Sequence, residues 1–210
     1  ETRPASPFHT TPIYTDSDQD KQILVPYFSD FYSPFIPSVF GLMGENLQNL
    51  PPSDQHSAEL GLKYANNEIC YPATLVVGDC IKALQSGQYD PSKIAFAITQ
   101  TGGQCRATNY IALIKKALVN AGYGNIPVIS ISIMNTINEQ PGFQPDVKKG
   151  AKSAIYAVLF ADALGKMYYA TAVREKVKGI AKQLREEYLT KAVEFVRQHK
   201  PTHLVGLMKE

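Results

Sequence analysis

The feature that most constrains the fold is an alternation of short apolar runs with longer helical patterns between residues 22 and 135. Four apolar runs have the length of strands, and they cover residues 23–27, 47–50, 94–99 and 128–133. Strands that alternate with helices in this way are joined by right-handed crossovers and lie parallel in one sheet. We therefore predict an α/β fold, a Rossmann-like parallel sheet with helices on both faces, followed by a C-terminal pair of long helices.

Helix boundaries follow from capping residues and periodicity. Ser33 opens the first helical pattern, and Ser53 or Asp54 caps the second. Gly122 closes the last helix of this region. The predicted element order is β-α-β-α-α-β-α-β, with helices over residues 34–42, 54–64, 72–84 and about 106–120.

The chain divides into three parts by composition. Residues 1–21 combine prolines with Ser, Thr and Asp and are predicted to be a linker or arm. Residues 22–140 are the α/β domain. Residues 141–210 carry no strand pattern and are predicted to be a helical region packed on the α/β domain or on a domain outside this chain. Two amphipathic stripes indicate its helices: Ala151, Ile155, Val158 and Leu159, and then Val173, Val177, Ile180, Leu184 and Tyr188. If this region docks on the α/β domain or on another domain, we expect the second stripe to be covered by protein, with Lys and Arg pointing outward.

Charge is distributed unevenly along the chain, although the net charge is only +2. Residues 1–147 carry 8 Lys/Arg and 13 Asp/Glu, whereas residues 148–200 carry 12 Lys/Arg and 5 Asp/Glu. A basic helix pair can bind nucleic acid, an anionic cofactor or an acidic neighbouring domain, but it is also typical of a solvated helix face. Aromatic residues are not interleaved with the cations as a base-stacking surface requires, so we expect no nucleic-acid partner.

Several classes of protein are excluded by composition. No apolar run approaches the roughly 18 to 20 residues that span a bilayer, so we predict a soluble protein with no membrane partner. Three cysteines without a signal-peptide pattern disfavour a secreted disulfide framework and favour the cytoplasm. The chain begins with Glu1 rather than Met, which favours a segment of a longer polypeptide.

Two of the three cysteines fall in loops that should lie at the carboxyl ends of the strands, where parallel sheets bind ligands. Cys70 ends a polar loop before a predicted helix, and Cys105 follows the pair Gly102 and Gly103 and precedes Arg106. A helix N-terminus stabilises the thiolate, which binds metals or attacks electrophiles. Glycine backbone N–H groups can approach an anion closely. The simpler alternatives are two small buried residues and a tight turn.

Other chemistry has weaker signals. Cys80 lies mid-helix on an apolar face and is predicted to be an inert core residue. The motifs of phosphate-binding loops, dinucleotide sites, zinc peptidases and nucleophile elbows are absent from the sequence, as is a Cys-x-x-Cys pair. A Cys–His nucleophile that uses His56 is an alternative. Asp79 is explained by helix solvation or capping rather than by acid–base catalysis.

Three stretches of the α/β region resemble a known family. They are residues 25–30 (VPYFSD), 60–74 (LGLKYANNEICYPAT) and 99–107 (TQTGGQCRA). They are similar to the activase-related large proteins of the 2-hydroxyacyl-CoA (2-hydroxyglutaryl-CoA) dehydratase system, and the resemblance covers about residues 22–135. In that anaerobic system an ATPase activator passes one electron to Rossmann-like subunits that hold [4Fe-4S] or related clusters through cysteines. The 2-hydroxyacyl-CoA then loses water by radical chemistry, which is a lyase reaction.

The resemblance implies that Cys70 and Cys105 are metal ligands of an iron–sulfur cluster and that Gly102, Gly103 and Arg106 adjoin this cofactor. It also implies that the chain is one cluster-type domain of a longer protein. Its partners would be the other domains, an ATPase activator module and an acyl-CoA, and a homodimer is compatible with it.

The ligand set departs from the family pattern. Dehydratase subunits supply about three cysteines per cluster, and this chain offers two candidates. The remaining ligands would have to come from elsewhere. Three hypotheses follow: an iron–sulfur electron-transfer or dehydratase-like module, a metal-free scaffold that binds a partner or acyl-CoA, and a thiol enzyme with Cys105 as nucleophile. The iron–sulfur hypothesis requires the sulfur atoms of Cys70 and Cys105 to lie within about 8 Å of each other.

Overall fold

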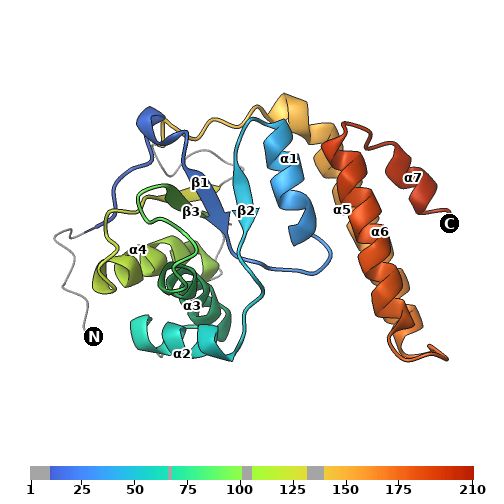
Figure 1. Cartoon of the computed structure of the whole chain (residues 1–210), viewed down its shortest axis with the longest axis horizontal. Helices are drawn as coiled ribbons and strands as arrows, with labels where there is room; N and C mark the ends of the chain where they lie inside the picture. The colour runs from blue at the N-terminus through green and yellow to red at the C-terminus, as the bar shows by residue number, and fades with distance from the viewer. Residues whose placement is uncertain (1–9, 66–67, 101–105, 132–139) are drawn as a thin grey trace. The chain divides into compact units, whose positions relative to one another are not determined.

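The computed structural model of the chain describes residues 10–65, 68–100, 106–131 and 140–210 (Figure 1). The chain divides into two compact units. The first, which we call the sheet unit, comprises Glu1–Tyr27 and Gln48–Gln144, and the second, the helical unit, comprises Phe28–Leu47 and Pro145–Glu210.

The sheet has four parallel strands in the order β2-β1-β3-β4. Their bounds are β1 (Gln22–Val25), β2 (Leu47–Asn49), β3 (Ile94–Thr99) and β4 (Val128–Ile131). β3 pairs in parallel with β1 on one side and with β4 on the other. Strand β1 ends before Pro26, which has no N–H group to donate to a neighbouring strand. The predicted α/β fold with a parallel sheet flanked by helices is confirmed.

In the described residues, three α-helices belong to the sheet unit: α2 (Gln55–Tyr64), α3 (Tyr71–Gln85) and α4 (Tyr110–Asn120). A 3-10 helix, η3 (Arg106–Asn109), precedes α4 and replaces the first turn of the helix that we predicted from about residue 106. Gly122 follows the end of α4 and has a φ of +80°, the left-handed conformation that commonly ends a helix, so the prediction that Gly122 ends this helix is confirmed. With α1 (Ile36–Leu42), these elements confirm the predicted order in the described residues.

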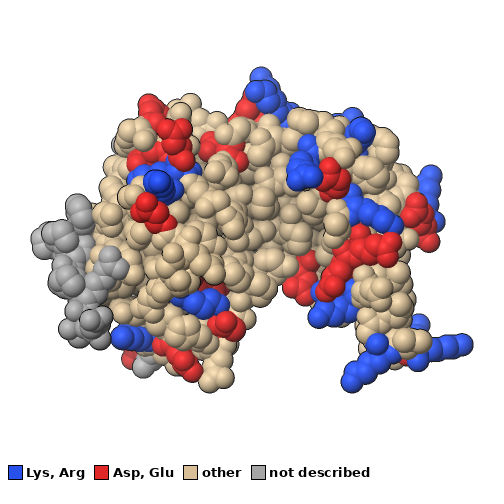
Figure 2. Space-filling model, in the orientation of Figure 1, with Lys and Arg blue, Asp and Glu red and all other residues tan. Residues whose placement is uncertain are grey.

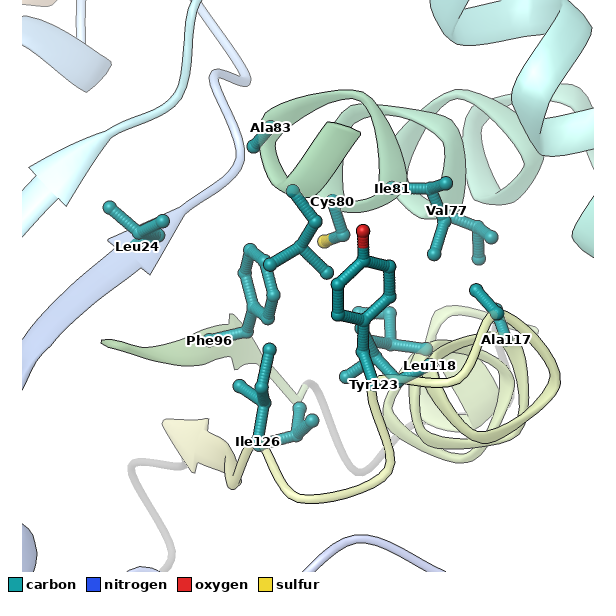
Figure 3. Close-up of a cluster of buried hydrophobic side chains, with 14 of the residues drawn as sticks. Leu24, Val77, Cys80, Ile81, Ala83, Phe96, Ala117, Leu118, Tyr123 and Ile126 are labelled. Carbon is teal, nitrogen blue, oxygen red and sulfur yellow. The ribbon is translucent and has the colours of Figure 1, made fainter. Parts of the chain in front are cut away.

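Helices α3 and α4 pack on one face of the sheet (Figure 3). Leu24 of β1 and Phe96 of β3 belong to the apolar cluster that residues of both helices complete. Cys80 of α3 is only 1% exposed and points towards the space between Phe96 and Tyr123. The prediction that Cys80 is a core residue is therefore confirmed.

Two glycines allow α2 and α3 to approach each other at backbone distance. A Cβ atom at Gly61 would lie 2.0 Å from the carbonyl oxygen of Thr74, and a Cβ at Gly78 would lie 1.7 Å from that of Ser57. Real Cβ atoms do not approach an oxygen so closely. The helix pair therefore depends on the absence of a side chain at both positions.

A cluster of polar side chains also joins the N-terminus of α2 to α3. Ser53 Oγ donates a hydrogen bond of 2.6 Å to the buried carboxylate of Asp79. Lys82 Nζ donates to Ser57 Oγ over 2.7 Å and lies 3.1 Å from the carboxylate of Asp54. Asp79 is thus a buried partner of the α2 N-terminus, which corrects our interpretation of it as a solvated or capping residue.

The helical unit contains α1, the long helices α5 (Val147–Ala172) and α6 (Ile180–Arg197), and the short α7 (His203–Leu207), which the sequence analysis did not predict. The 3-10 helix η2 (Ser33–Phe35) leads into α1. The apolar core of this unit is separate from that of the sheet unit. It joins residues of α1, α5, α6 and α7 with Phe31 and Phe35.

The buried face of α5 differs from the predicted stripe. Ile155, Val158 and Leu159 are 60%, 54% and 55% exposed. The buried residues are mostly small, which allows the neighbouring elements to pack closely: Gly150, Ser153, Ala157, Phe160, Ala161, Leu164 and Gly165. Helical spacing identified the helix, but hydrophobicity alone selected the wrong face.

The second predicted stripe is also wrong in part. Helix α5 ends at Ala172 and α6 begins at Ile180, so Val173 and Val177 lie in the connecting turn. Gly179 has a φ of +91°, a left-handed conformation that interrupts the helical period. Val173 is 83% exposed and Val177 is 67% exposed. This chain therefore does not cover these two residues, and cover of the stripe by a domain outside the chain stays a prediction.

The two units are not consecutive in the sequence. Phe28–Leu47 belongs to the helical unit although it lies between β1 and the body of the sheet unit. A single boundary near residue 140 therefore does not separate them.

Part of the predicted N-terminal arm packs within the sheet unit. Tyr14 is 1% exposed, and its carbonyl oxygen accepts a hydrogen bond from the N–H of Gly142, which lies in the same unit.

The glycine contact between α2 and α3 can be tested with Gly78→Ala. An alanine normally stabilises a helix interior, but here the new methyl group meets a backbone oxygen. We expect the free energy of unfolding to fall by about 1–3 kcal/mol or more, measured by urea denaturation. Gly41→Ala is the control, because a Cβ there meets nothing within 4 Å. Equal stability of Gly78→Ala and the wild type would contradict the packing.

The cap of α2 predicts an acid-dependent loss of stability. The backbone N–H of Ser57 donates to the carboxylate of Asp54, and together with Lys82 it lowers the pKa of Asp54 from 3.8 to about 2. The stability that this ionised cap contributes is therefore complete above about pH 4 and lost as the pH falls through about 2. Asp54→Asn should lack this pH dependence. The difference in the free energy of unfolding between the wild type and Asp54→Asn should therefore become smaller as the pH falls from about 4 to about 2. A difference that stays constant over this pH range would contradict the prediction.

Candidate functional site

The carboxyl ends of β3 and β4 carry a network of uncharged polar side chains. Gln100, directly after β3, accepts a hydrogen bond of 2.7 Å from Ser130 Oγ, and its amide nitrogen donates to the carbonyl oxygen of Thr108 in η3. The backbone N–H of Ser130 donates to Gln140 Oε1 over 3.1 Å. The network therefore ties the ends of both strands to the start of the α4 segment. Ligands bind at this edge in parallel sheets.

Cys70 reaches the same edge from α3. It is the N-cap residue of that helix, and its side chain is half-buried. Its Sγ lies 3.1 Å from the hydroxyl oxygen of Tyr110, the first residue of α4. The predicted position of Cys70 at a helix N-terminus is confirmed. Tyr110 was not predicted, since nothing in its sequence context distinguishes it from a core tyrosine.

The other predicted cofactor residues lie at or beyond the limit of the described residues. Gly102, Gly103 and Cys105 are outside them, and Arg106 is the first residue of η3, without a described side chain. The predicted separation of about 8 Å between the sulfurs of Cys70 and Cys105 stays a prediction.

Cys80 and His56 take no part in this edge. Burial, together with the neighbouring charge of Asp79, raises the pKa of the Cys80 thiol, so it stays protonated. His56 is an exposed residue of α2 that lies 3.5 Å from a carboxylate oxygen of Glu59. Among the residues that the structure describes, the side chain that His56 contacts is the carboxylate of Glu59 rather than a cysteine.

Within the part of the chain that the structure describes, no three His, Cys, Asp or Glu residues are grouped closely enough to hold a metal ion. Cys70 is thus the one predicted ligand whose position is described. None of the described helices has the length and apolarity needed to cross a membrane.

Comparison of the chain with models of protein families, with curated proteins and with solved structures found no match. The site is therefore defined by its own geometry: in the described residues, the carboxyl edge of a parallel α/β sheet carries amides, hydroxyls and the partly accessible thiol of Cys70 at a helix N-terminus.

The three cysteines should differ in reactivity. Cys70 is partly accessible at a helix N-terminus, whereas Cys80 reacts only when the core opens. In the metal-free folded chain near neutral pH, a thiol reagent should label Cys70 and Cys105 at least about tenfold faster than Cys80, measured by mass spectrometry of peptides. In urea the rates should converge. Faster labelling of Cys80 in the folded chain would refute the assignment.

Proposed function

We propose that the sheet unit is an iron–sulfur module of the electron-transfer or dehydratase-like type, in which Cys70 and Cys105 are cluster ligands. One observation carries the proposal. The Cys70 thiol lies against Tyr110 at the start of α4, and the segment that leads into this helix contains Cys105. The resemblance of residues 22–135 to dehydratase-related proteins supplies the chemical class.

The donor chemistry of Cys70 fits such a group. A thiolate is the usual ligand of iron in clusters, and the partial positive charge of the α3 N-terminus favours that anion. Cys80 is excluded as a ligand because it is enclosed in the core. Two thiols are fewer than a [4Fe-4S] cluster takes, so the remaining ligands would come from another domain or from an added thiol. Gly102, Gly103 and Arg106 would adjoin the cluster.

When bound, the cluster would supply one-electron transfer at low potential. The residues of this chain would hold and shield its ligands. The Tyr110 hydroxyl would donate a hydrogen bond to the Cys70 thiolate, which favours the deprotonated sulfur. Gln100, which is hydrogen-bonded to Ser130 and Thr108, would hold the end of β3 next to η3. Hydrogen bonds to a ligand sulfur also tune the reduction potential of a cluster.

The proposal is tested by anaerobic reconstitution of the chain with iron, sulfide and an excess of a small thiol. We expect bound iron and acid-labile sulfide with a broad visible absorption. Cys70→Ser and Cys105→Ser should each lower the iron content by at least about half, because each removes one ligand. Cys80→Ala should retain it. Iron binding that neither loop substitution changes would refute the proposed site, provided that circular dichroism shows each variant to be folded.

A metal-free module that binds an acyl-CoA is the second candidate, and a specific hollow favours it. A cavity of about 300 Å³ on α4 is lined in part by Lys115 and Lys116, cations that can pair with the phosphates of such a ligand. Burial lowers the pKa of Lys115. Titration calorimetry should then show that the wild-type chain binds CoA. The double variant Lys115→Gln with Lys116→Gln should lose this binding, and the control variant Cys70→Ser should retain it. Absence of binding would exclude this candidate.

A further inference from the structure

The far end of the α5–α6 hairpin exposes a mixture of apolar and basic side chains that the sheet-edge site does not explain. Its exposed apolar residues come from the last turns of α5, the connecting turn and the first turns of α6, and we call them the hairpin-end patch. They are Met167, Tyr169, Val173, Val177, Ile180 and Leu184. Soluble surfaces rarely carry so many large apolar side chains together without a partner.

Cations lie at the same end of the hairpin as this patch. The connecting turn and the start of α6 contribute Arg174, Lys176, Lys178 and Lys182. Figure 2 shows Lys and Arg gathered at this end of the hairpin, next to surface without charge. Among the described ion pairs, none involves Arg174, Lys176 or Lys178. These three charges are therefore available to an external anion.

Glu175, the acidic residue of the connecting turn, forms hydrogen bonds within the turn itself. Glu175 accepts hydrogen bonds from the backbone N–H groups of Gly179, over 2.6 Å, and Ala181, over 3.0 Å. These bonds lower the pKa of Glu175, so it stays ionised. They also hold the turn in the conformation that presents Val173 and Val177 outward. The net charge offered to a partner at this end is consequently positive.

An apolar hollow continues the patch inward between the two helices. It has a volume of about 310 Å³, and Met167 and Leu184 of the patch lie at its wall. Phe160 and Leu164 of the helical-unit core also line it. A hollow of this kind can accept part of an acyl chain or a similar apolar group.

We propose that the hairpin-end patch binds the surface of an anionic lipid bilayer. Aliphatic side chains flanked by lysines are the composition of surfaces that lie in the membrane interface, where the apolar groups enter the acyl region and the cations meet the lipid phosphates. Nucleic acid fits less well, because it would gain nothing from the exposed valines and would favour stacking aromatics. The expectation of no membrane partner rested on the absence of a spanning segment, and surface binding does not require one.

The test is sedimentation of the 210-residue chain with vesicles of phosphatidylcholine alone or with about one third phosphatidylserine. We expect binding to the anionic vesicles at low salt, little binding to the neutral ones, and weakening as salt rises. Each cation near the surface strengthens binding about fivefold, so Lys176→Gln with Lys178→Gln should weaken it at least about tenfold. Lys148→Gln with Lys149→Gln, at the other end of α5, is the matched control and should leave binding unchanged.

The apolar part of the proposal has its own readout. The chain contains no Trp, so Val177→Trp introduces a single reporter whose emission should shift to the blue on anionic vesicles. Ile155→Trp, at a similarly exposed position of α5, should show no shift. Val173→Ser with Val177→Ser should weaken binding without changing the circular dichroism spectrum.

Three results would overturn the proposal. They are absence of binding to anionic vesicles at low salt, salt-sensitive binding to RNA or DNA that the valine substitutions do not affect, and a dimer that these substitutions dissociate. The last result would assign the patch to a second copy of the chain.

Discussion

The central strand β3 is the element on which the sheet unit depends. Its residues from Ile94 to Ile98 are all at most 2% exposed, and it pairs with β1 and β4 at once. Bulky residues alternate with Ala95 and Ala97, and only the bulky face belongs to the core that α3 and α4 complete. Because β3 is enclosed on both faces and paired at both edges, its carboxyl end has a defined position in the sheet. Gln100 directly follows this end.

The candidate site results from where the chain leaves this strand. Gln100 joins the end of β3 to Ser130 in β4 and to Thr108 in η3, and Tyr110 then meets Cys70 at the start of α3. The contact between α2 and α3 through Gly61 and Gly78 fixes the helix that carries Cys70. The position of the thiol therefore depends on contacts between elements that are far apart in the sequence.

The helical unit follows a different packing rule. Its longest helix, α5, buries mainly small residues and leaves Ile155, Val158 and Leu159 exposed. Small residues allow close approach of neighbouring elements, and large apolar residues then remain outside. A hydrophobicity pattern ranks the large residues as the core, so it selects the opposite face. Val173 and Val177 are exposed for a different reason, because they lie in the turn between α5 and α6, where Gly179 interrupts the helical period.

The sequence by itself determined the element order, the parallel sheet, the core position of Cys80 and the place of Cys70 at a helix start. These features depend on local periodicity, capping and chain direction, which short stretches encode. Only the tertiary structure decided that Tyr110 lies beside Cys70, that Asp79 is buried against Ser53, and that residues 28–47 belong with the C-terminal helices. Each of these joins residues that are far apart in the chain, and a single sequence does not record which distant side chains meet when the chain packs.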